Sequence, residues 1–383
     1  MRWREARGSC PDQVPATVWR TGLLMAALVC TSSACAPDAT TPRELKFGHV
    51  GEPGSLFALS ADEFARRANE RLPEGWEVVT YGSSQLGGDE LLLQKIKLGT
   101  VDFALPSTIM SSQVDAFGLF EMPYLVQDRE HMMAIEEAVV WPHLVPRAEE
   151  AGYRIVAVWE NGFRHVTNNR KPIQAPADLA GIKLRTPSGV WRLKLFQALG
   201  ANPTPMALSE VFIALQTGVI DGQENPLAQI WGSKLYEVQD YLSLTGHVYT
   251  PAYVVTSPSR WDALPDDVRT ILEEEARATQ AFVYETAEHL DADLLDRIRA
   301  GGVEVNDPDP QPFLDAAGPL YQEFVTTVEG AGELVEQANA VRSRFVSGST
   351  RRRLRSWWRS THDRLPRAPR PSRPAHRPGG GSP

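Results

Sequence analysis

The chain has almost no cysteine. Its three cysteines, Cys10, Cys30 and Cys35, all lie within the first 35 of 383 residues, so the rest of the sequence contains neither a disulfide nor a thiolate metal site. The eight histidines show no HExxH or comparable spacing, and no cysteine is near enough to complete a zinc site. The sequence therefore excludes structural zinc, and we expect no metal and no cofactor.

A membrane-spanning run is also absent from the N-terminus. The apolar run 23–30 follows Arg20 and is far shorter than the ~20 residues that a spanning helix needs. Small residues follow it up to Cys35, which predicts an export signal over residues 1–34. Cleavage before Cys35 would leave a cysteine at the new N-terminus, as in bacterial lipoproteins, although Ser32 stands where leucine is usual. We expect a periplasmic protein with Cys35 as the candidate lipidation site.

Positive charge is scarce in the body of the chain. The net charge is −9, yet ten arginines and one aspartate lie from Ser349 onward, so the preceding residues carry −18. An acidic body argues against nucleic-acid binding, which needs a basic face. The Arg- and Pro-rich residues 349–383 cannot bury a core, and we expect them to be disordered. That composition has two alternative explanations. Either the segment contacts anionic lipid, or it results from read-through or a frame error beyond the true C-terminus.

Motifs typical of enzymes are missing. No nucleophile elbow, P-loop or dinucleotide glycine fingerprint occurs. Carboxylates are plentiful, but no pair is marked by its spacing as an acid/base couple. These absences favour a binding protein over an enzyme.

Strands and helices alternate along the body. Apolar segments 45–50, 76–81 and 101–105 predict strands with helices between them, which is typical of a mostly parallel sheet. A capping box at 60–63 predicts the start of the first helix. One helical pattern runs from 264 to 299 and would span ~50 Å. We expect an α/β fold in which this long helix lies across two domains.

Polar groups gather in the stretch 181–227 at the ends of predicted elements, where α/β folds place ligands. Arg185 ends the predicted strand 182–185, and its guanidinium offers a rigid fork that matches a carboxylate. A structural ion pair with a nearby acid is the alternative. Asn225 follows a predicted polar turn, and its carboxamide either supports a bound carboxylate or satisfies its own loop.

Other candidates rest on position alone. Trp191 lies in the first turn of the next predicted helix, where its ring belongs either to the core or to a ligand contact. Arg164 and His49 are isolated ionisable residues on predicted strands, and each fits a ligand contact or a satisfied core residue. Asp89 is predicted to cap a helix, and Ser107 ends the third strand.

Several segments resemble the substrate-binding proteins of tripartite ATP-independent periplasmic (TRAP) transporters, the DctP-type family. They are residues 84–87, 99–102, 163–170, 200–206 and 215–226. The resemblance covers about residues 43–345 and implies a two-lobed α/β clamp with a ligand cleft between the lobes and a long helix spanning both. It implies lobe I from 43–161 plus 251–290 and lobe II from 162–250 plus 291–345.

The same resemblance implies roles for particular residues. Arg185 is implied to pair with the ligand carboxylate, Asn225 to support it, and Arg164 to add a further contact. His49, Glu160 and the region 249–251 are similar to the branch of the family that handles sugar acids and small carboxylates. We therefore expect an organic acid, with uronates or similar hydroxy acids first.

The pocket differs from that of the sialic-acid binders of the family. Leu208 stands in place of an aromatic residue, Val50 in place of an asparagine and Ser107 in place of an acid, so we do not expect sialic acid. The expected partners are TRAP membrane permease subunits, and we expect a monomer. A receptor that presents its ligand to a sensor kinase and a secreted sugar-acid enzyme remain alternatives.

Overall fold

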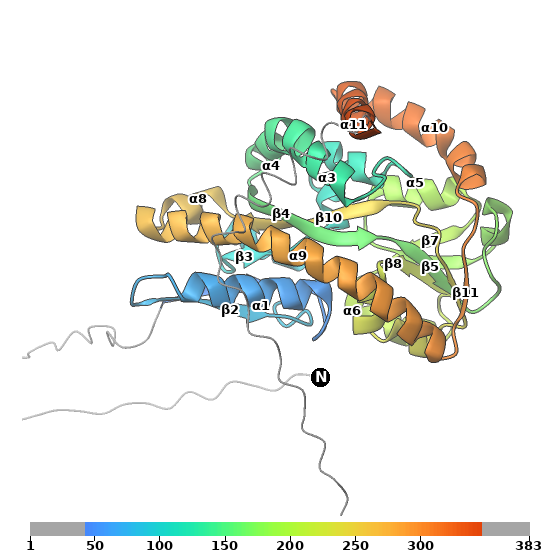
Figure 1. The fold of residues 1–383 in the computed structure, drawn as a ribbon, viewed down its shortest axis with the longest axis horizontal. Coiled ribbons are helices and arrows are strands. Elements are labelled where there is room, and N and C mark those ends of the chain that lie inside the picture. Colours follow the sequence, from blue (N-terminus) through green and yellow to red (C-terminus); the bar gives the residue numbers. More distant parts are fainter. Residues whose placement is uncertain (1–42, 347–383) are drawn as a thin grey trace, which may run out of the picture. The chain divides into compact units, whose positions relative to one another are not determined.

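The computed structural model describes residues 43–346 (Figure 1). The predicted export signal with Cys35 and the basic segment 349–383 lie outside these residues. Within them, no helix combines the length and the apolar character needed to cross a membrane.

The first sheet has five strands in the order β2-β1-β3-β10-β4. They are β1 (Arg43–Gly48), β2 (Trp76–Tyr81), β3 (Phe103–Ala104), β4 (Arg154–Phe163) and β10 (Tyr249–Thr256). β1 pairs parallel with β2 and β3, and β10 pairs antiparallel with β3 and β4. The carboxyl ends of β1 to β4 therefore share one edge of the sheet, as the βαβ pattern predicts.

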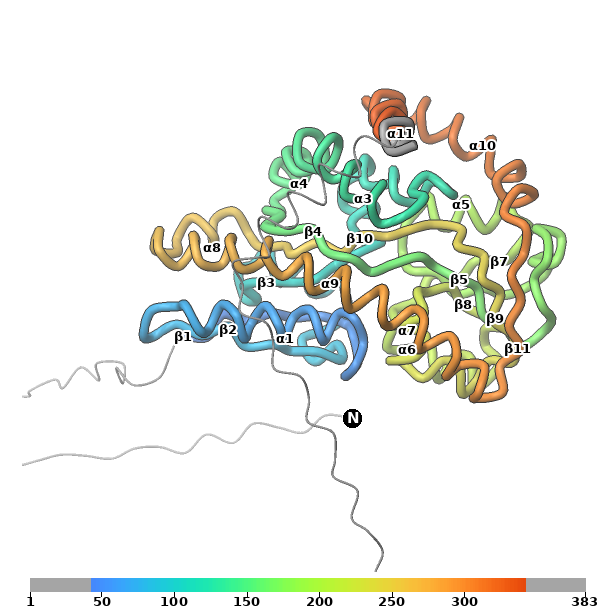
Figure 2. The backbone as a smooth tube through the Cα atoms, viewed as in Figure 1, coloured from blue at the N-terminus to red at the C-terminus, as the bar shows by residue number. Residues whose placement is uncertain are grey.

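The second sheet has six strands in the order β11-β9-β5-β8-β6-β7. They are β5 (His165–Asn168), β6 (Lys183–Thr186), β7 (Asn202–Pro205), β8 (Gly222–Asn225), β9 (Tyr241–Ser243) and β11 (Glu304–Asn306). β6 is parallel to β7 and β8, so their carboxyl ends lie together. The chain crosses from β4 to β5 at Arg164 and returns between β9 and β10 (Figure 2).

Helices connect and cover the strands. They are α1 (Leu56–Asn69), α2 (Asp89–Leu98), η1 (Thr108–Ser112), η2 (Asp115–Glu121), α3 (Arg129–Ile135), η3 (Glu136–Leu144), α4 (Val145–Glu150), η4 (Pro176–Leu179), α5 (Val190–Ala198), α6 (Leu208–Gln216), α7 (Leu227–Gly232), η5 (Leu235–Val238), α8 (Pro258–Asp262), α9 (Asp266–Ala300), α10 (Gln311–Thr327) and α11 (Ala331–Val346).

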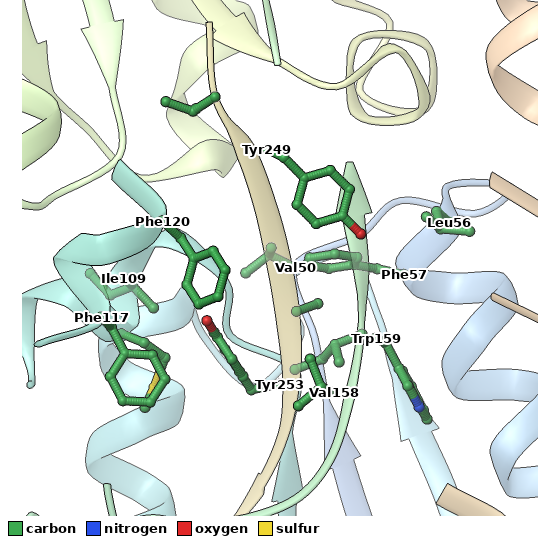
Figure 3. Close-up of a cluster of buried hydrophobic side chains, with 14 of the residues drawn as sticks. Val50, Leu56, Phe57, Ile109, Phe117, Phe120, Val158, Trp159, Tyr249 and Tyr253 are labelled. Atoms are coloured by element: carbon green, nitrogen blue, oxygen red, sulfur yellow. The ribbon is translucent and has the colours of Figure 1, made fainter. Parts of the chain in front are cut away.

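The predicted long helix is confirmed as α9 (Figure 1). It packs against β4 and α1 of the first sheet's layer and against α7, which follows β8 of the second sheet. One continuous helix therefore braces elements of both sheets. Beside it, Trp159 donates its indole N–H to Ala276 O of α9 at 2.8 Å. Figure 3 shows Trp159 among the aromatic side chains of the first sheet's core.

Two predicted helix caps are wrong. α1 begins one turn early, because Leu56 and Phe57 bury their side chains there, and Ser55 accepts the capping hydrogen bond from Ala58 N. Ser60 lies inside the helix, where its hydroxyl donates to Leu56 O. Gly88 is the N-cap of α2, so Asp89 is the first helical residue and makes no cap.

The predicted polar turn after Asp221 is also wrong, because residues 222–225 form the buried strand β8. Gly222 allows β8 to approach β5 closely. An alanine Cβ there would lie 2.3 Å from Thr167 O. Because this oxygen belongs to the backbone, relieving the clash requires a displacement of the strand that costs stability.

We expect Gly222→Ala to destabilise the protein by about 2–3 kcal/mol through overpacking, measured by urea denaturation. Gly318→Ala is the matched control. Gly318 lies in α10, and nothing lies within 4 Å of its added Cβ. This exchange should stabilise by about 0.5–1 kcal/mol. Equal effects of the two exchanges would contradict the steric explanation.

Candidate functional site

Arg185 lies on β6 near its carboxyl end, and its side chain is almost fully buried. Its Nε and Nη2 donate to Met206 O at 2.9 and 2.6 Å. Within residues 43–346 no carboxylate forms a salt bridge with it, and its Nη1 has no hydrogen-bond partner. Burial lowers the pKa of Arg185 to about 10, so it stays protonated at neutral pH. One side of the guanidinium is thus anchored, and the other remains available to an anion.

Asp89 faces Arg185 from the layer of the first sheet. It opens α2, and Gly88 before it lies close to Ala207, whose Cβ is 3.8 Å from the position of an added Cβ. Asp89 Oδ1 is buried without a hydrogen-bond partner among the described residues. Burial raises the pKa of Asp89 to about 7, although the attraction of Arg185 opposes the shift. Asp89 and Arg185 therefore lie near enough for each charge to shift the pKa of the other.

A buried carboxylate, Glu224, lies on β8, and its negative charge raises the pKa of Arg185 against the effect of burial. It accepts hydrogen bonds from Arg164 Nε at 2.6 Å and Nη2 at 3.0 Å, from Arg192 Nη1 at 2.6 Å, and from His247 Nε2 at 3.1 Å. Arg192 also donates to Glu121 Oε2 of η2 at 2.6 Å. Burial would raise the pKa of Glu224, but Arg164 and Arg192 outweigh it and hold that pKa well below its usual range.

The charges of this cluster do not balance. Three guanidinium groups, those of Arg164, Arg185 and Arg192, influence one another's pKa. Only two carboxylates, Glu121 and Glu224, form salt bridges within the cluster. His247 is neutral at pH 7, because burial lowers its pKa to about 4. With a pKa of about 7, Asp89 is only partly ionised at neutral pH, so the positive charge of Arg185 is incompletely compensated, and a buried charge of this kind favours an anion nearby.

Asn225 lies next to Glu224 and is held on both sides. Its Oδ1 accepts from Arg164 Nη2 at 3.0 Å, and its Nδ2 donates to Gln223 Oε1 at 2.6 Å. Arg164 therefore orients Asn225 and binds Glu224 at the same time. The structure brings Arg185, Asn225, Arg164 and Asp89 into one neighbourhood; of these only Arg185 was predicted at a strand end.

Two more of the predicted residues lie at the carboxyl edge of the first sheet. His49 follows β1 and is buried beside Gly82, and its Nδ1 has no partner in the described part of the chain. Burial lowers the pKa of His49 to about 4, so it is neutral. Ser107 follows β3, and its hydroxyl donates to Pro251 O at 2.6 Å.

Trp191 and Glu160 lie in structural contacts. The Trp191 ring packs edge-on against Phe324 of α10 at 5.1 Å. Glu160 accepts from Arg129 Nε at 2.7 Å and Nη2 at 2.6 Å, and Arg129 also binds Asp291 of α9. The packing of Trp191 matches the core alternative of its prediction, whereas the ion pair of Glu160 with Arg129 was not predicted.

The sequence prediction missed Glu224, Arg192, Glu121 and His247 as members of the cluster. The sequence did offer one signal for Glu224, which directly precedes Asn225. An acid buried beside Asn225 needs a positively charged partner, so a buried cluster could have been predicted there. Arg192 and Glu121 lie 71 residues apart and share no local pattern. Within residues 43–346, no group of three or more His, Cys, Asp or Glu side chains is arranged to hold a metal ion.

Asp89 should make stability depend on pH. Its pKa of about 7 in the folded protein exceeds the value of about 3.9 in an unfolded chain. Its stabilising contribution is therefore full below pH 4 and is lost as the pH rises through 7. Asp89→Asn cannot ionise, so the ligand-free variant should gain on the order of 1–3 kcal/mol over the wild type at pH 8 and little at pH 4, allowing for solvent screening.

Thermal denaturation of Asp89→Asn and the wild type at both pH values measures this gain. A difference that is the same at pH 4 and pH 8 would show that Asp89 does not titrate in this range.

Known proteins share this sequence and this fold. The family model for bacterial extracellular solute-binding proteins, family 7, matches residues 47–327. The 2,3-diketo-L-gulonate-binding periplasmic protein YiaO of Escherichia coli is 30% identical over 81% of this chain and 95% of its own length.

Two solved structures of TRAP-type proteins resemble the fold. The sugar acid binding protein DctPAm of Advenella mimigardefordensis, in complex with galactonate, has a TM-score of 0.75 and 30% identity over 79% of this chain and 99% of its own. A TRAP periplasmic solute binding protein of Sulfurospirillum deleyianum with bound succinate has a TM-score of 0.74 and 31% identity over 79% and 99%. The two sheets and the helix α9 are thus those of a two-lobed clamp, and the chain belongs to family 7 of the bacterial extracellular solute-binding proteins, the DctP type of TRAP transporters.

Proposed function

We propose that this protein captures an organic acid, a sugar acid such as a uronate or another small carboxylate, and delivers it to a TRAP membrane permease driven by an ion gradient. The observation that carries the proposal is the buried guanidinium of Arg185, which forms no salt bridge with any carboxylate of residues 43–346 although Arg164 and Arg192 beside it do. A ligand carboxylate beside Arg185 neutralises it. A guanidinium fork binds a carboxylate with two parallel hydrogen bonds.

The similar proteins support an acid as the ligand. One is named for 2,3-diketo-L-gulonate, and two structures hold galactonate and succinate. All three compounds are carboxylates, although they differ in length and in hydroxyl groups. The common element is the carboxylate, which is the group that Arg185 recognises in this proposal.

In this proposal the remaining residues have distinct roles. Asn225 supports the carboxylate that Arg185 binds, and Arg164 contributes by holding Asn225. Asp89, His49 and Ser107 contact the rest of the ligand from the edge of the first sheet. Trp191 and Glu160 act indirectly, through the packing of α5 and the ion pair with Arg129.

The proposed lobes follow the two sheets. Lobe I comprises residues 43–161 plus 251–290, and lobe II comprises 162–250 plus 291–330, in place of the expected 291–345. We assign α11 to lobe I, because it packs against α3 and η3. The proposal further includes a periplasmic monomer with a lipid anchor at Cys35, and a receptor that releases its ligand chemically unchanged and is not an enzyme.

Mass spectrometry of the compound that co-purifies with the protein, followed by calorimetric titration with uronates, aldonates and dicarboxylates, tests the proposal. We expect an acid to bind and to be recovered unchanged. Equal binding of the neutral sugar and its acid would contradict the role of the positive cluster. Conversion of the bound acid into a product would contradict a receptor.

A further inference from the structure

The guanidinium of Arg129 joins two carboxylates from distant parts of the chain. Arg129 is the first residue of α3, and its Nε donates to Glu160 Oε2 at 2.7 Å. Its Nη2 donates to Glu160 Oε1 at 2.6 Å and to Asp291 Oδ2 of α9 at 2.5 Å. The two acids lie 31 and 162 residues from Arg129 in the sequence. One side chain therefore holds both β4 and α9 to α3.

Glu160 lies where the pairing of β4 with β10 becomes irregular. The register of the two strands shifts between Glu160 and Gly162, and Asn161 has no partner in the ladder. An extra residue of this kind is a β-bulge, which bends a strand locally. Gly162 has φ +120°, and the chain then continues into β5 of the second sheet. Arg129 thus binds β4 directly before the bulge through which the chain leaves the first sheet.

Asp291 has the corresponding place on α9 (Figure 1). On its N-terminal side, three residues of α9 bond the layer of the first sheet: Glu275 with Arg67, Ala276 with Trp159, and Gln280 with Val158. On its C-terminal side, two residues lie against helices that follow β8 of the second sheet: Arg297 over the ring of Trp231, and Gly301 beside Tyr236. Among these contacts, Asp291 is the last with the first layer before those with the second layer begin.

The two acids bound by Arg129 differ in exposure. The side chain of Glu160 is 1% exposed, whereas that of Asp291 is 40% exposed. Removing Arg129 would leave a buried carboxylate unpaired, which costs much stability. Removing the charge of Asp291 breaks a pair that solvent already screens, so it should change the folding stability little. The bond to α9 can therefore be broken in a folded protein.

We propose that Arg129 is a positioning residue that ties the crossing segments of β4 and α9 to α3, so that the clamp bends only beyond Glu160 and Asp291. This inference rests on the proposed function, because the tie acts on closure around a ligand. A segment held at a fixed point has fewer conformations than a free one. The tie thus reduces the conformational entropy that closure must remove, and it strengthens binding without contact with the ligand.

Calorimetric titration of the full-length Asp291→Asn variant tests the inference. The probes are D-galactonate, D-glucuronate and succinate, and the acid that the wild type binds most tightly is used throughout. We expect the variant to bind that acid about three- to tenfold more weakly, while its Tm changes by less than about 2 °C. Asp293→Asn is the matched control, because Asp293 is an exposed acid of α9 whose partner, Arg297, lies on the same helix. It should bind as the wild type does.

Three further measurements separate positioning from a general structural effect. Asp291→Glu keeps the acid and should bind within about twofold of the wild type. Arg129→Lys keeps a positive charge for Glu160 but loses the fork that reaches two acids, so adding Asp291→Asn to it should weaken binding no further. Sodium chloride at about 0.5 M screens the exposed pair, so the affinities of the wild type and Asp291→Asn should approach each other.

Each result decides between the alternatives. If Asp291→Asn binds as the wild type does, or no more weakly than Asp293→Asn, the positioning role is wrong while the proposed function stands. Additive losses in the double variant, or a difference in affinity that salt leaves unchanged, would also contradict that role. If the wild type binds none of the acids, the proposed function is wrong and the inference falls with it.

Discussion

Arg185→Ala is expected to weaken binding of the organic acid by about 2–5 kcal/mol, which corresponds to a loss of roughly 30-fold or more. In the proposed function, closure of the clamp on the wild-type protein takes the ligand carboxylate out of water, where its attraction to a guanidinium is stronger than in solvent. In the variant the carboxylate is buried without its main partner. The anchoring of Arg185 to Met206 O means that little side-chain entropy is lost on binding.

Lysine at this position should rescue binding only in part, since an ammonium lacks the planar fork. Arg170→Ala is the matched control, because Arg170 is exposed and its nearest acid oxygen, on Asp221, is 3.9 Å away. Calorimetry with the same acid should give wild-type affinity for that control. Unchanged affinity in Arg185→Ala would remove Arg185 from the site and leave Arg164 as the remaining candidate.

Strong local patterns predicted the parts of the fold that depend on them. The predicted start of α9 lies within two residues of the observed start. An amphipathic pattern of 35 residues that follows a proline fits only a long helix. β2 was predicted from Trp76 to Tyr81, as observed. The strand β8 was not predicted, since Gly222, Gln223, Glu224 and Asn225 carry no apolar side chain. Its burial depends on partners from β5, α5 and the return segment, which no local pattern reveals.

The site was predictable to a similar extent. Arg185 was marked by its place at the end of a predicted strand, and Asn225 by its place after a predicted turn; their roles toward a ligand come from the family resemblance and stay predictions. The role of Arg164 as the residue that joins Glu224 to Asn225 depends on contacts across 60 and 61 residues of sequence. The carboxylate of Glu160 forms an ion pair with Arg129, which lies 31 residues away in the sequence. No local sequence pattern predicts this pair. Non-local pairing decides whether a buried charge is free to bind a ligand.

Glu224→Gln should produce the largest loss of stability, about 3–5 kcal/mol. Glu224 is fully buried and receives hydrogen bonds from Arg164, Arg192 and His247. Glutamine has nearly the same shape but no charge, so both guanidinium groups stay buried with Glu121 as the only carboxylate of the network. Replacing Arg192 with methionine in the same chain removes one of the two buried guanidinium charges. The double variant should therefore lose less stability than the two single variants together.

Urea denaturation at pH 7 measures these differences, with Glu237→Gln as the control for an exposed acid on η5. The pKa of Glu224 is depressed in the folded protein, so its stabilisation is present above the unfolded value of about 4.3 and is lost as the pH falls through the folded value. The wild type and Glu224→Gln should therefore converge in stability as the solution becomes strongly acidic. A loss of less than about 1 kcal/mol at pH 7 would mean that water reaches the cluster, since only a dry interior makes the unpaired charges costly.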